Sequence, residues 1–439
     1  MPSPKRYALV GAGSRSFMFG RALLKTYAAT ARLVALCDIN PLRAAAWQAE
    51  MGTALPVYGA GDFEAMLREE RIDTVIVTTV DRTHHRYICA AMEAGCDVVT
   101  EKPMTVDEEK CREILATQAR TGRDLRVTFN YRYAPRNSKV KALLMEGVIG
   151  RVNSVHFEWL LDTKHGADYF RRWHRDKRNG GGLMVHKATH HFDLVNWWLE
   201  SVPQTVMAMG GLTFYGRENA EARGVTEFYA RGTGSEVARR DPFALDLKKD
   251  DLMRRLYWEA ESADGYQRDQ SVFGDGISIE DDMGVLVRYR NRAVMTYHLT
   301  AYSPWEGYRV AFNGSAGRLE YEVTETPYVS AVAGDYNFAR NVLGSSAHTV
   351  TEPVSLLVRP HWGEPRRIEL PAATEGGHGG ADARLLEDIF GENPPDDPLR
   401  RAAGAKAGAW SILAGIAANR SMATGLPVNV ADLVPGLGE

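Results

Sequence analysis

The sequence is poor in cysteine, and it lacks long apolar runs and any marked excess of charge of one sign. Its four cysteines include no pair at the two-residue spacing typical of zinc and redox sites. No segment approaches the roughly 18 apolar residues of a membrane span, and no apolar N-terminal stretch precedes a cleavage-type site. We therefore expect a cytoplasmic protein with reduced thiols and no membrane partner.

Charge is close to balanced. The formal net charge is −3 and 25% of the residues are charged, so no basic excess indicates a nucleic-acid partner. Hydrophobic residues make up 44% of the chain, which is ordinary for a globular protein. A chain of 439 residues is long enough for two or three domains with buried cores.

A glycine-rich turn follows the first apolar run. Gly11 and Gly13 occupy the first two glycine positions of a GxGxxG dinucleotide motif, and Ser16 stands at the third. Glycines there let the backbone approach a pyrophosphate, and the following helix N-terminus offers free N–H groups. We predict that this turn, with Ser14 and Arg15, binds a dinucleotide, although a glycine pair alone could be a plain turn.

Asp38 follows the second apolar run and bears on the choice of cofactor. An acidic side chain roughly 20 to 25 residues after the glycines can accept hydrogen bonds from ribose hydroxyls and would repel a 2′-phosphate. NAD is therefore favoured over NADP. Arg43 keeps the alternative open, because an arginine close by could instead meet a phosphate.

Apolar strands continue to alternate with helical segments. Strands are predicted at residues 74–79 and 98–100, with a helix at 87–94 between them. This alternation predicts a doubly wound parallel sheet, whose ligands lie beyond the carboxyl ends of the strands. Thr79 and His84 lie at such an end, so we assign them to the cofactor site.

Glu101, Lys102 and Pro103 follow the next strand. A Glu-Lys pair is usually a solvated ion pair, but the proline restricts the preceding residue to an extended conformation. Lys102 could then lie over a cofactor ring or a substrate hydroxyl, where an ammonium group would stabilise a developing alkoxide. We predict that Lys102 is catalytic and also contacts the cofactor, and that Glu101 belongs to the cofactor site.

Residues 180–193 read GGGLMVHKATHHFD and hold the main histidine cluster. A helix after the glycines would project His186 and His190 from one face, since they are four residues apart. Imidazoles transfer protons near neutral pH, so both are catalytic candidates. Lys187 and His191 are candidates for substrate binding. Zinc is the alternative, but no third ligand or HExxH motif accompanies the pair, and we expect no metal.

A basic run precedes these glycines at residues 169–175. Arg171, Arg172 and Arg175 could form an anion clamp, because guanidinium groups match carboxylate, sulfonate or phosphate oxygens. Trp173 could stack on a sugar face. The alternatives are a solvated surface for the arginines and a core position for the tryptophan.

The second half of the chain predicts a strand-rich, antiparallel sheet. Residues 152–161 alternate in polarity, 279–299 contain two strands across a turn, and 318–323 follow a glycine turn. Between residues 215 and 277 the pattern breaks into charged, glycine-containing segments. This stretch predicts an insertion over the pocket or a disordered flap.

These motifs stand in one order along the chain, which resembles the Gfo/Idh/MocA family of NAD(P)-dependent oxidoreductases over most of its length. The resemblance implies an α/β fold: an N-terminal Rossmann domain over residues 1–130, then a domain with a large open, mostly antiparallel sheet over 131–439 that ends in a closing helix at 403–424. Tyr131 lies in the link between them and is assigned to substrate binding. The resemblance also implies a sugar or polyol substrate and a homodimer or homotetramer.

Roles for single residues follow from the same resemblance. Lys102 matches the lysine that binds substrate near the nicotinamide, and His190 matches the histidine assigned to proton transfer. Two positions depart from the family: His186 stands where an aspartate is common, and a TPN turn reads Thr79-Val80-Asp81. Removal of an anion at position 186 predicts that the substrate needs no carboxylate partner there.

Three functions are compatible with these residues. We favour redox-neutral glycoside hydrolysis, in which the sugar is oxidised, its substituent is eliminated, water adds and the hydride returns. Several imidazoles could serve its proton transfers, and the arginines would suit an anionic glycoside such as a sulfoquinovoside. The alternative is a net NAD-dependent dehydrogenase of a sugar or polyol. A non-catalytic NAD-bound sensor, the third, leaves Lys102 and the histidines without a task.

Overall fold

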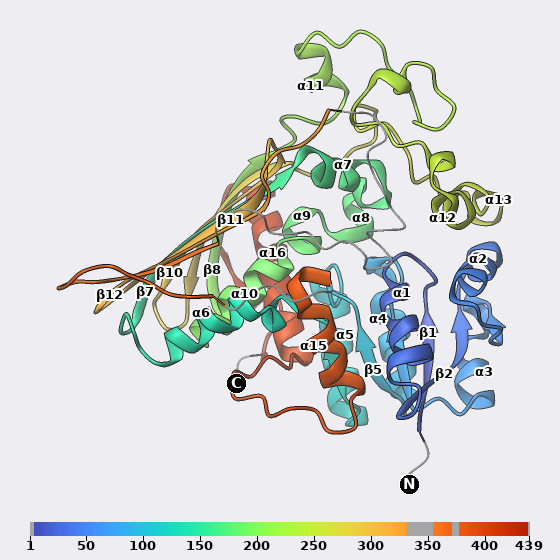
Figure 1. Ribbon diagram of the computed structural model, residues 1–439, viewed down its shortest axis with the longest axis horizontal. Coiled ribbons are helices and arrows are strands. Elements are labelled where there is room, and N and C mark those ends of the chain that lie inside the picture. Colours follow the sequence, from blue (N-terminus) through green and yellow to red (C-terminus); the bar gives the residue numbers. More distant parts are fainter. Residues whose placement is uncertain (1–3, 332–353, 371–376, 438–439) are drawn as a thin grey trace.

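The structure, a computed structural model, describes residues 4–331, 354–370 and 377–437. Figure 1 shows two sheets: one in the N-terminal part of the chain, drawn in blue and surrounded by helices, and one of long strands with helices packed on one side. The first is parallel and the second mostly antiparallel. The predicted α/β fold class is confirmed.

Within the described residues the first sheet has six strands, in spatial order β3-β2-β1-β4-β5-β6, and its pairs are parallel. The strand order reverses between β1 and β4, and such a sheet binds its ligand at this point, beyond the strand ends. The strands are β1 (Lys5–Val10), β2 (Ala31–Cys37), β3 (Val57–Tyr58), β4 (Thr74–Val77), β5 (Asp97–Thr100) and β6 (Leu125–Val127). The connecting helices are α1 (Ser16–Arg21), η1 (Ala22–Thr26), α2 (Pro41–Met51), η2 (Ala60–Asp62), α3 (Phe63–Glu69), η3 (Asp81–Thr83), α4 (His84–Glu93) and α5 (Glu108–Thr121).

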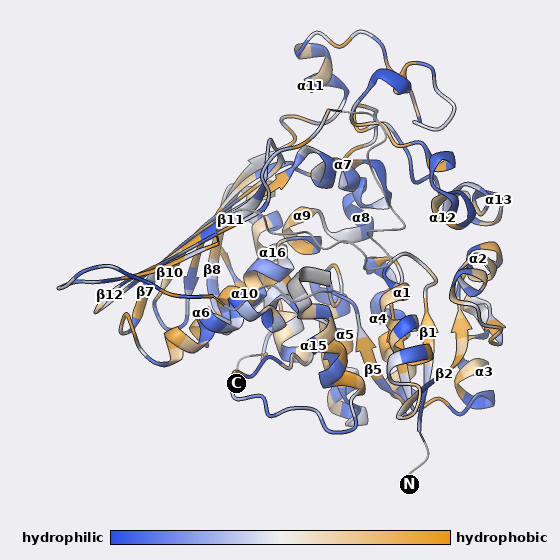
Figure 2. Cartoon of the chain, in the orientation of Figure 1, coloured by the Kyte–Doolittle hydropathy of each residue, from blue (hydrophilic) through white to orange (hydrophobic). Residues whose placement is uncertain are grey.

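Burial on both faces explains why these strands are apolar throughout. All four residues of β4 are buried, as are the last four of β1, and Figure 2 shows apolar strands between helices whose outer sides are polar. Parallel strands covered by helices on both faces read as continuous apolar runs. The carboxyl ends of β1 and β4, where the predicted cofactor residues lie, are therefore held by a buried core.

Helix α2 begins and ends at clear local signals. The Asn40 side chain accepts a hydrogen bond from the Arg43 N–H at 3.0 Å, and Pro41 occupies the first turn. Gly52, at φ +63°, ends the helix in the left-handed conformation that glycine adopts readily. This cap fixes the start of α2 next to Asp38.

The second sheet has nine strands within the described residues, in spatial order β14-β13-β12-β11-β7-β10-β9-β8-β15. The pair β7–β10 is parallel and the other pairs are antiparallel. Burial alternates along β10 and β12, as expected when one face meets a core. The strands are β7 (Val152–Asp162), β8 (Pro203–Gly211), β9 (Asp282–Tyr289), β10 (Val294–Ser303), β11 (Glu306–Gly314), β12 (Gly317–Thr326), β13 (Ser355–Pro360), β14 (Arg366–Arg367) and β15 (Val428–Asn429).

The predicted single helix over the histidine cluster is wrong. Two helices occupy the segment, α9 (Leu183–His186) and α10 (Thr189–Leu199). The N–H of Ala188 bonds to the Leu183 carbonyl, five residues back, at 2.8 Å, which widens the turn and ends α9. His186 and His190 therefore belong to different helices.

A long helix, α16 (Ala405–Thr424), occupies most of the predicted closing segment and packs on α9, α10 and β8. Gly415 makes this approach possible, because a Cβ there would lie 2.2 Å from the Met184 carbonyl oxygen. The remaining helices of the second half, outside the insertion, are η4 (Asn130–Tyr133), α6 (Pro135–Met145), α7 (Thr163–Arg171), η5 (Trp173–Arg175), α8 (Lys177–Gly180), α15 (Gly377–Phe390) and η9 (Val430–Asp432).

The predicted insertion joins β8 to β9 and contains only short helices: α11 (Arg217–Ala222), η6 (Ala238–Arg240), η7 (Leu247–Lys249), α12 (Asp251–Met253), η8 (Arg254–Trp258) and α13 (Glu261–Asp264). In Figure 1 it runs from α11 at the top of the molecule to α12 and α13 beside α2. Leu252 and Leu256 are buried in one apolar cluster with Trp47 of α2, so the insertion packs on the N-terminal domain.

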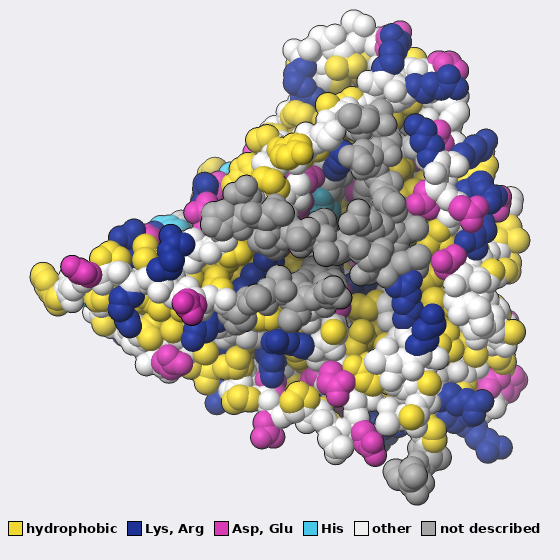
Figure 3. All heavy atoms as spheres, viewed as in Figure 1, with side chains coloured by type: hydrophobic (Ala, Val, Ile, Leu, Met, Phe, Trp, Pro, Cys, Tyr) yellow, Lys and Arg dark blue, Asp and Glu magenta, His cyan; other side chains and the backbone are white. Residues whose placement is uncertain are grey.

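Surface charge is mixed on the face shown in Figure 3, where Lys and Arg side chains alternate with Asp and Glu. None of the helices in the described ranges combines the length and apolarity needed to cross a bilayer.

Candidate active site

The glycine turn packs against the backbone of Thr78 and is held by a hydrogen bond from Ser16. Gly11 has φ +93°, and a Cβ there would lie 2.7 Å from the Thr78 carbonyl oxygen, so glycine is required. A Cβ on Gly13 would meet nothing within 4 Å, which leaves open space beside the backbone where a pyrophosphate could approach. The hydroxyl of Ser16 is buried and donates to the Gly13 carbonyl oxygen at 2.5 Å. Ser14, in the same turn, is partly exposed.

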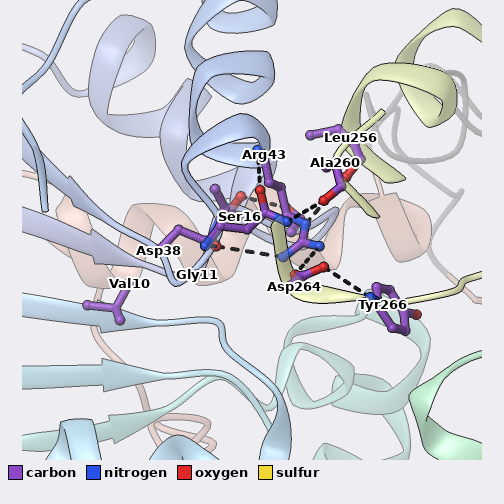
Figure 4. Close-up of polar contacts among 12 residues, drawn as sticks. Val10, Gly11, Ser16, Asp38, Arg43, Leu256, Ala260, Asp264 and Tyr266 are labelled. Atoms are coloured by element: carbon purple, nitrogen blue, oxygen red, sulfur yellow. Dashed lines mark hydrogen bonds and ion pairs between the residues drawn. The ribbon is translucent and has the colours of Figure 1, made fainter. Parts of the chain in front are cut away.

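Asp38 lies at the end of β2 and faces this turn (Figure 4). Its two oxygens accept hydrogen bonds from the N–H groups of Ala12, at 2.6 Å, and Asn40, at 2.7 Å. Burial raises the pKa of Asp38, against the influence of Arg43. Arg43 donates to Asp264 of the insertion at 2.7 Å and lies 3.6 Å from Asp38. The arginine that left the choice of cofactor open is thus already paired.

Glu101 connects the glycine turn to the Lys102 loop. Its carboxylate accepts from Arg15 Nε at 2.7 Å and from the Lys102 N–H at 3.2 Å, and the Lys102–Pro103 peptide bond is cis. Arg15 also lies 3.7 Å from Asp382. Arg15 and Glu101 therefore bind each other and position the two loops that border the predicted cofactor site.

His84 connects two further loops. It is buried, with Nδ1 2.9 Å from the Pro103 carbonyl oxygen and Nε2 3.1 Å from that of Thr79. The Thr79 hydroxyl oxygen accepts from Thr83 at 2.9 Å. The ring of His84 is thus used to hold the strand-end loops together, a positioning task.

Lys102 reaches across to the second domain. Its Nζ lies 3.4 Å from the His186 carbonyl oxygen. Burial lowers the pKa of Lys102 to about 8, against the raising influence of Glu101 and Asp81, and Lys187 lowers it further. A lysine with this pKa changes charge close to neutral pH, as proton-transfer and charge-stabilising groups in active sites do.

The two residues that depart from the family pattern, Asp81 and His186, contact each other. Asp81 Oδ2 lies 2.5 Å from His186 Nδ1, and His186 Nε2 lies 3.1 Å from His174 Nε2. A carboxyl group therefore does lie beside position 186, contributed by the altered turn, and burial raises the pKa of Asp81 well above its usual range. Sequence reasoning missed His174, although it belongs to the basic run before the glycines.

Burial and neighbouring cations favour the neutral imidazole of His186. Burial lowers the pKa of His186 well below its usual range, and the cations Lys102 and Arg172 lower it further. A neutral ring that donates from Nδ1 to Asp81 has an acceptor at Nε2, which the Nε2–H of His174 can fill. The three side chains form a hydrogen-bonded chain able to pass a proton.

His190 and Tyr131 form a second group. Their rings stack with centroids 4.4 Å apart, and Tyr131 stacks in turn on Trp159 at 5.7 Å. Lys187 lies with Nζ 4.8 Å from the centre of the Trp159 ring, and burial lowers its pKa. The predicted residues His190, Tyr131 and Lys187 are thus brought together.

His191 lies elsewhere. It is fully buried, with Nδ1 2.6 Å from the Tyr297 hydroxyl and its ring stacked on Trp159 at 4.0 Å. The structure places this residue in the core between α10 and the second sheet, rather than where substrate binding was predicted.

Two of the three predicted clamp arginines hold the insertion. Arg171 donates to the Phe243 carbonyl oxygen at 2.7 Å, and Arg175 donates to those of Ser271 at 3.1 Å and Asp275 at 2.7 Å. These bonds occupy their guanidinium groups with backbone of the insertion, which is a structural use.

Arg172 belongs instead to a cationic cluster. Asp168 lies 3.0 Å from Arg172 Nε and 3.1 Å from Nη1 of Arg268, a buried residue of the insertion. Although burial opposes the shift, Arg172, Arg268 and Arg171 hold the pKa of Asp168 well below its usual range. Three guanidinium groups around one carboxylate leave the cluster positive next to His174, whose pKa is lowered by burial and by Arg172. Trp173 stacks on His174 at 3.5 Å.

The zinc alternative finds no support in these contacts. No group of three or more His, Cys, Asp or Glu side chains in the described parts of the chain is arranged to hold a metal ion.

The chain belongs to the Gfo/Idh/MocA oxidoreductase family. Residues 5–129 match the family's NAD-binding Rossmann fold, and residues 141–430 match its C-terminal alpha/beta domain. The resemblance predicted from the motifs is confirmed, and with it an NAD-dependent enzyme. The glycine turn and Asp38 fit this cofactor, because one offers open space beside the backbone and the other a carboxylate at the ribose position.

Relatives and solved structures agree with this assignment. A protein of Bacillus subtilis (strain 168) named as an oxidoreductase, YteT, is 34% identical over 98% of both chains. A D-glucoside 3-dehydrogenase of Escherichia coli (strain K12) is 32% identical over 44% of this chain and 53% of its own length. The crystal structure of an oxidoreductase from Agrobacterium radiobacter in complex with NAD+, L-tartaric acid and magnesium has a TM-score of 0.62 at 14% identity, covering 98% of this chain and 99% of its own.

Proposed function

We propose that the protein oxidises a secondary hydroxyl on the ring of a sugar or glycoside. His190 would accept the hydroxyl proton, bound NAD would supply the hydride acceptor, and the product would be a ring ketone. The observation that carries this proposal is the position of Lys102, which extends from the NAD-binding domain to the backbone of His186 with a pKa of about 8. Its ammonium group would donate a hydrogen bond to the substrate oxygen and stabilise the alkoxide as the hydride leaves.

Relatives named as dehydrogenases support this function over the hydrolysis favoured by the sequence. They include the D-glucoside 3-dehydrogenase and an inositol 2-dehydrogenase of Rhizobium meliloti. The test is to supply glucosides and inositols with NAD and to follow NADH by absorbance. Lys102→Ala should lower kcat by about 10²- to 10⁴-fold, and activity equal to that of the unmodified protein would overturn the proposal.

Redox-neutral glycoside hydrolysis is the second candidate, and the chain Asp81–His186–His174 is the observation that favours it. A ketone at ring carbon 3 acidifies the proton on carbon 2. The chain would take that proton at Nδ1 of His174, which has no hydrogen-bond partner among the described residues. The substituent on carbon 1 would leave with a proton, water would add across carbons 1 and 2, and the hydride and a proton would return to carbon 3 and its oxygen. This sequence needs proton-transfer groups beyond His190, and the chain supplies them.

Product stoichiometry separates the two candidates. With nitrophenyl glycosides and NAD in catalytic amount, hydrolysis releases nitrophenol without net NADH. A dehydrogenase forms one NADH for each sugar oxidised and releases no nitrophenol.

We further propose that the substrate carries an anionic group next to the cluster of Arg172, Arg268 and Asp168. The net positive charge of that cluster, beside His174, supports the proposal. A sulfoquinovoside should then have a higher kcat/KM than the matching glucoside. Arg172→Gln should remove most of that difference, while an equal kcat/KM for both substrates would exclude it.

A further inference from the structure

We propose that the insertion sets the choice of dinucleotide from the second domain: Asp264 holds Arg43 away from the ribose and thereby excludes a 2′-phosphate. Asp264 is in this sense a positioning residue that acts through Arg43. Asp38 alone disfavours the phosphate, but an arginine five positions later could reverse that preference. The inserted carboxylate removes this possibility.

Every nitrogen of the Arg43 guanidinium has a partner in the structure. Nη2 donates to Asp264 at 2.7 Å, Nε donates to the Leu256 carbonyl oxygen at 3.3 Å, and Nη1 lies 3.6 Å from Asp38. Figure 4 shows Asp264 and Leu256 approaching from the insertion on one side and Asp38 from the end of β2 on the other. Two of these three partners come from the insertion, more than 200 residues away along the chain.

Further contacts hold the insertion in this place. Asn40, which caps α2, donates through its side-chain amide to the Ala260 carbonyl oxygen at 2.8 Å. Arg255 of η8 donates to Glu50 of α2 at 2.7 Å. With Leu256 buried beside Trp47, these contacts attach η8 and α13 to both ends of α2. Asp264 is therefore presented to Arg43 by a packed segment.

The charges at this position explain the discrimination. Two carboxylates, Asp38 and Asp264, lie around one guanidinium group, so the surroundings of the ribose are negative overall. A 2′-phosphate would meet this negative charge and find Arg43 already paired. If Asp264 lost its charge, Arg43 could turn toward the phosphate and bind it with two parallel hydrogen bonds.

The test is to measure the dissociation constants of NADH and NADPH by fluorescence titration, which requires neither substrate nor turnover. Asp264→Asn keeps the shape and removes the charge. We expect it to shift the NADPH-to-NADH preference toward NADPH by about tenfold or more, a change of about 1.4 kcal/mol. Adding Arg43→Gln to this variant should abolish the gain, because the gain depends on the guanidinium group.

Arg255→Gln is the matched control. It removes one bond to α2, while the Asn40–Ala260 hydrogen bond and the burial of Leu256 still hold the segment, so Asp264 stays paired with Arg43 and the NADPH-to-NADH preference should not change. Asp264→Ser provides a second variant should the asparagine variant fold poorly, and circular dichroism checks both. An unchanged preference in the Asp264 variants, or an equal shift in Arg255→Gln, would overturn the proposal.

Discussion

Asp81 and His186 act as one unit whose two residues each depart from the family pattern. The family commonly has an amide at position 81 and a carboxylate at position 186. This chain has the carboxylate at 81 and an imidazole at 186, at 2.5 Å. The carboxyl group has moved from one domain to the other, and the imidazole gained in the exchange reaches His174 at 3.1 Å. A proton-transfer chain is thereby added beside Lys102.

The double substitution Asp81→Asn with His186→Asp restores the family pattern and tests what the exchange adds. We expect sugar oxidation to be retained within about tenfold, since Lys102 and His190 remain. If the chain acts in hydrolysis, the second candidate function, release of nitrophenol should fall by about 10²-fold or more because His174 loses its partner. Both rates are measured with one nitrophenyl glycoside. His174→Asn serves as the control, with the same loss of nitrophenol release, and equal effects on both rates would contradict this division of roles.

The pKa of Lys102 predicts how activity depends on pH. Burial lowers this pKa to about 8, so the ammonium group is present below that pH and is lost above it. If the charged form stabilises the alkoxide, kcat/KM falls above pH 8 by up to about tenfold per pH unit. Initial rates of NADH formation between pH 6 and 10 give the profile.

Lys102→Arg is the informative comparison, because a guanidinium group keeps its charge across this range. Its kcat/KM should be lower but should not fall above pH 8. A rise of kcat/KM through pH 8 in the unmodified protein would instead mean that the neutral amine acts as a base.

At the scale of helices and strands, the sequence predicted whatever depends on local periodicity. The strands expected at 152–161 and 279–299 correspond to β7, β9 and β10, because a half-buried strand shows its period of two in the sequence. The break between α9 and α10 was missed, as was the packing of Gly415 on Met184 of α9, because a contact between residues far apart along the chain is not visible in local periodicity. Arg268 was missed for the same reason: its partner Asp168 lies 100 residues earlier.

The contact between α16 and α9 gives an element-scale prediction. In Gly415→Ala the new Cβ would lie only 2.2 Å from the Met184 carbonyl oxygen, so α16 must move away from α9. Overpacking of this kind costs about 1 to 3 kcal/mol of the free energy of unfolding. The shift is measured by urea unfolding. Gly404→Ala is the control, because its Cβ would lie 3.5 Å from the nearest atom, the Leu125 carbonyl oxygen. It should change the free energy of unfolding by less than about 1 kcal/mol. An equal loss of stability in both variants would contradict this account of the contact.

At the scale of the whole molecule, the insertion is the feature that sequence analysis placed least well. Its charged and glycine-containing composition predicted an insertion over the pocket or a disordered flap, and it did not predict that η8 shares an apolar cluster with α2 or that Arg268 binds Asp168. One segment therefore touches both the ribose end of the cofactor site and the cationic cluster near His174. Neither contact is visible in local sequence, because both join residues far apart along the chain.

The outer face of the second sheet predicts self-association. Met209 of β8 is 70% exposed and Leu286 of β9 is 47% exposed, and both lie on the face opposite α16. Apolar side chains gathered on an open sheet mark an interaction surface, and a face shared by identical chains closes most simply in a symmetric dimer.

We expect a homodimer or homotetramer by light scattering, and Met209→Glu with Leu286→Glu should shift the measured mass toward that of the monomer. Met145→Glu, at a 47% exposed apolar residue on α6, is the control and should leave the mass unchanged; a monomeric unmodified protein would exclude this use of the sheet.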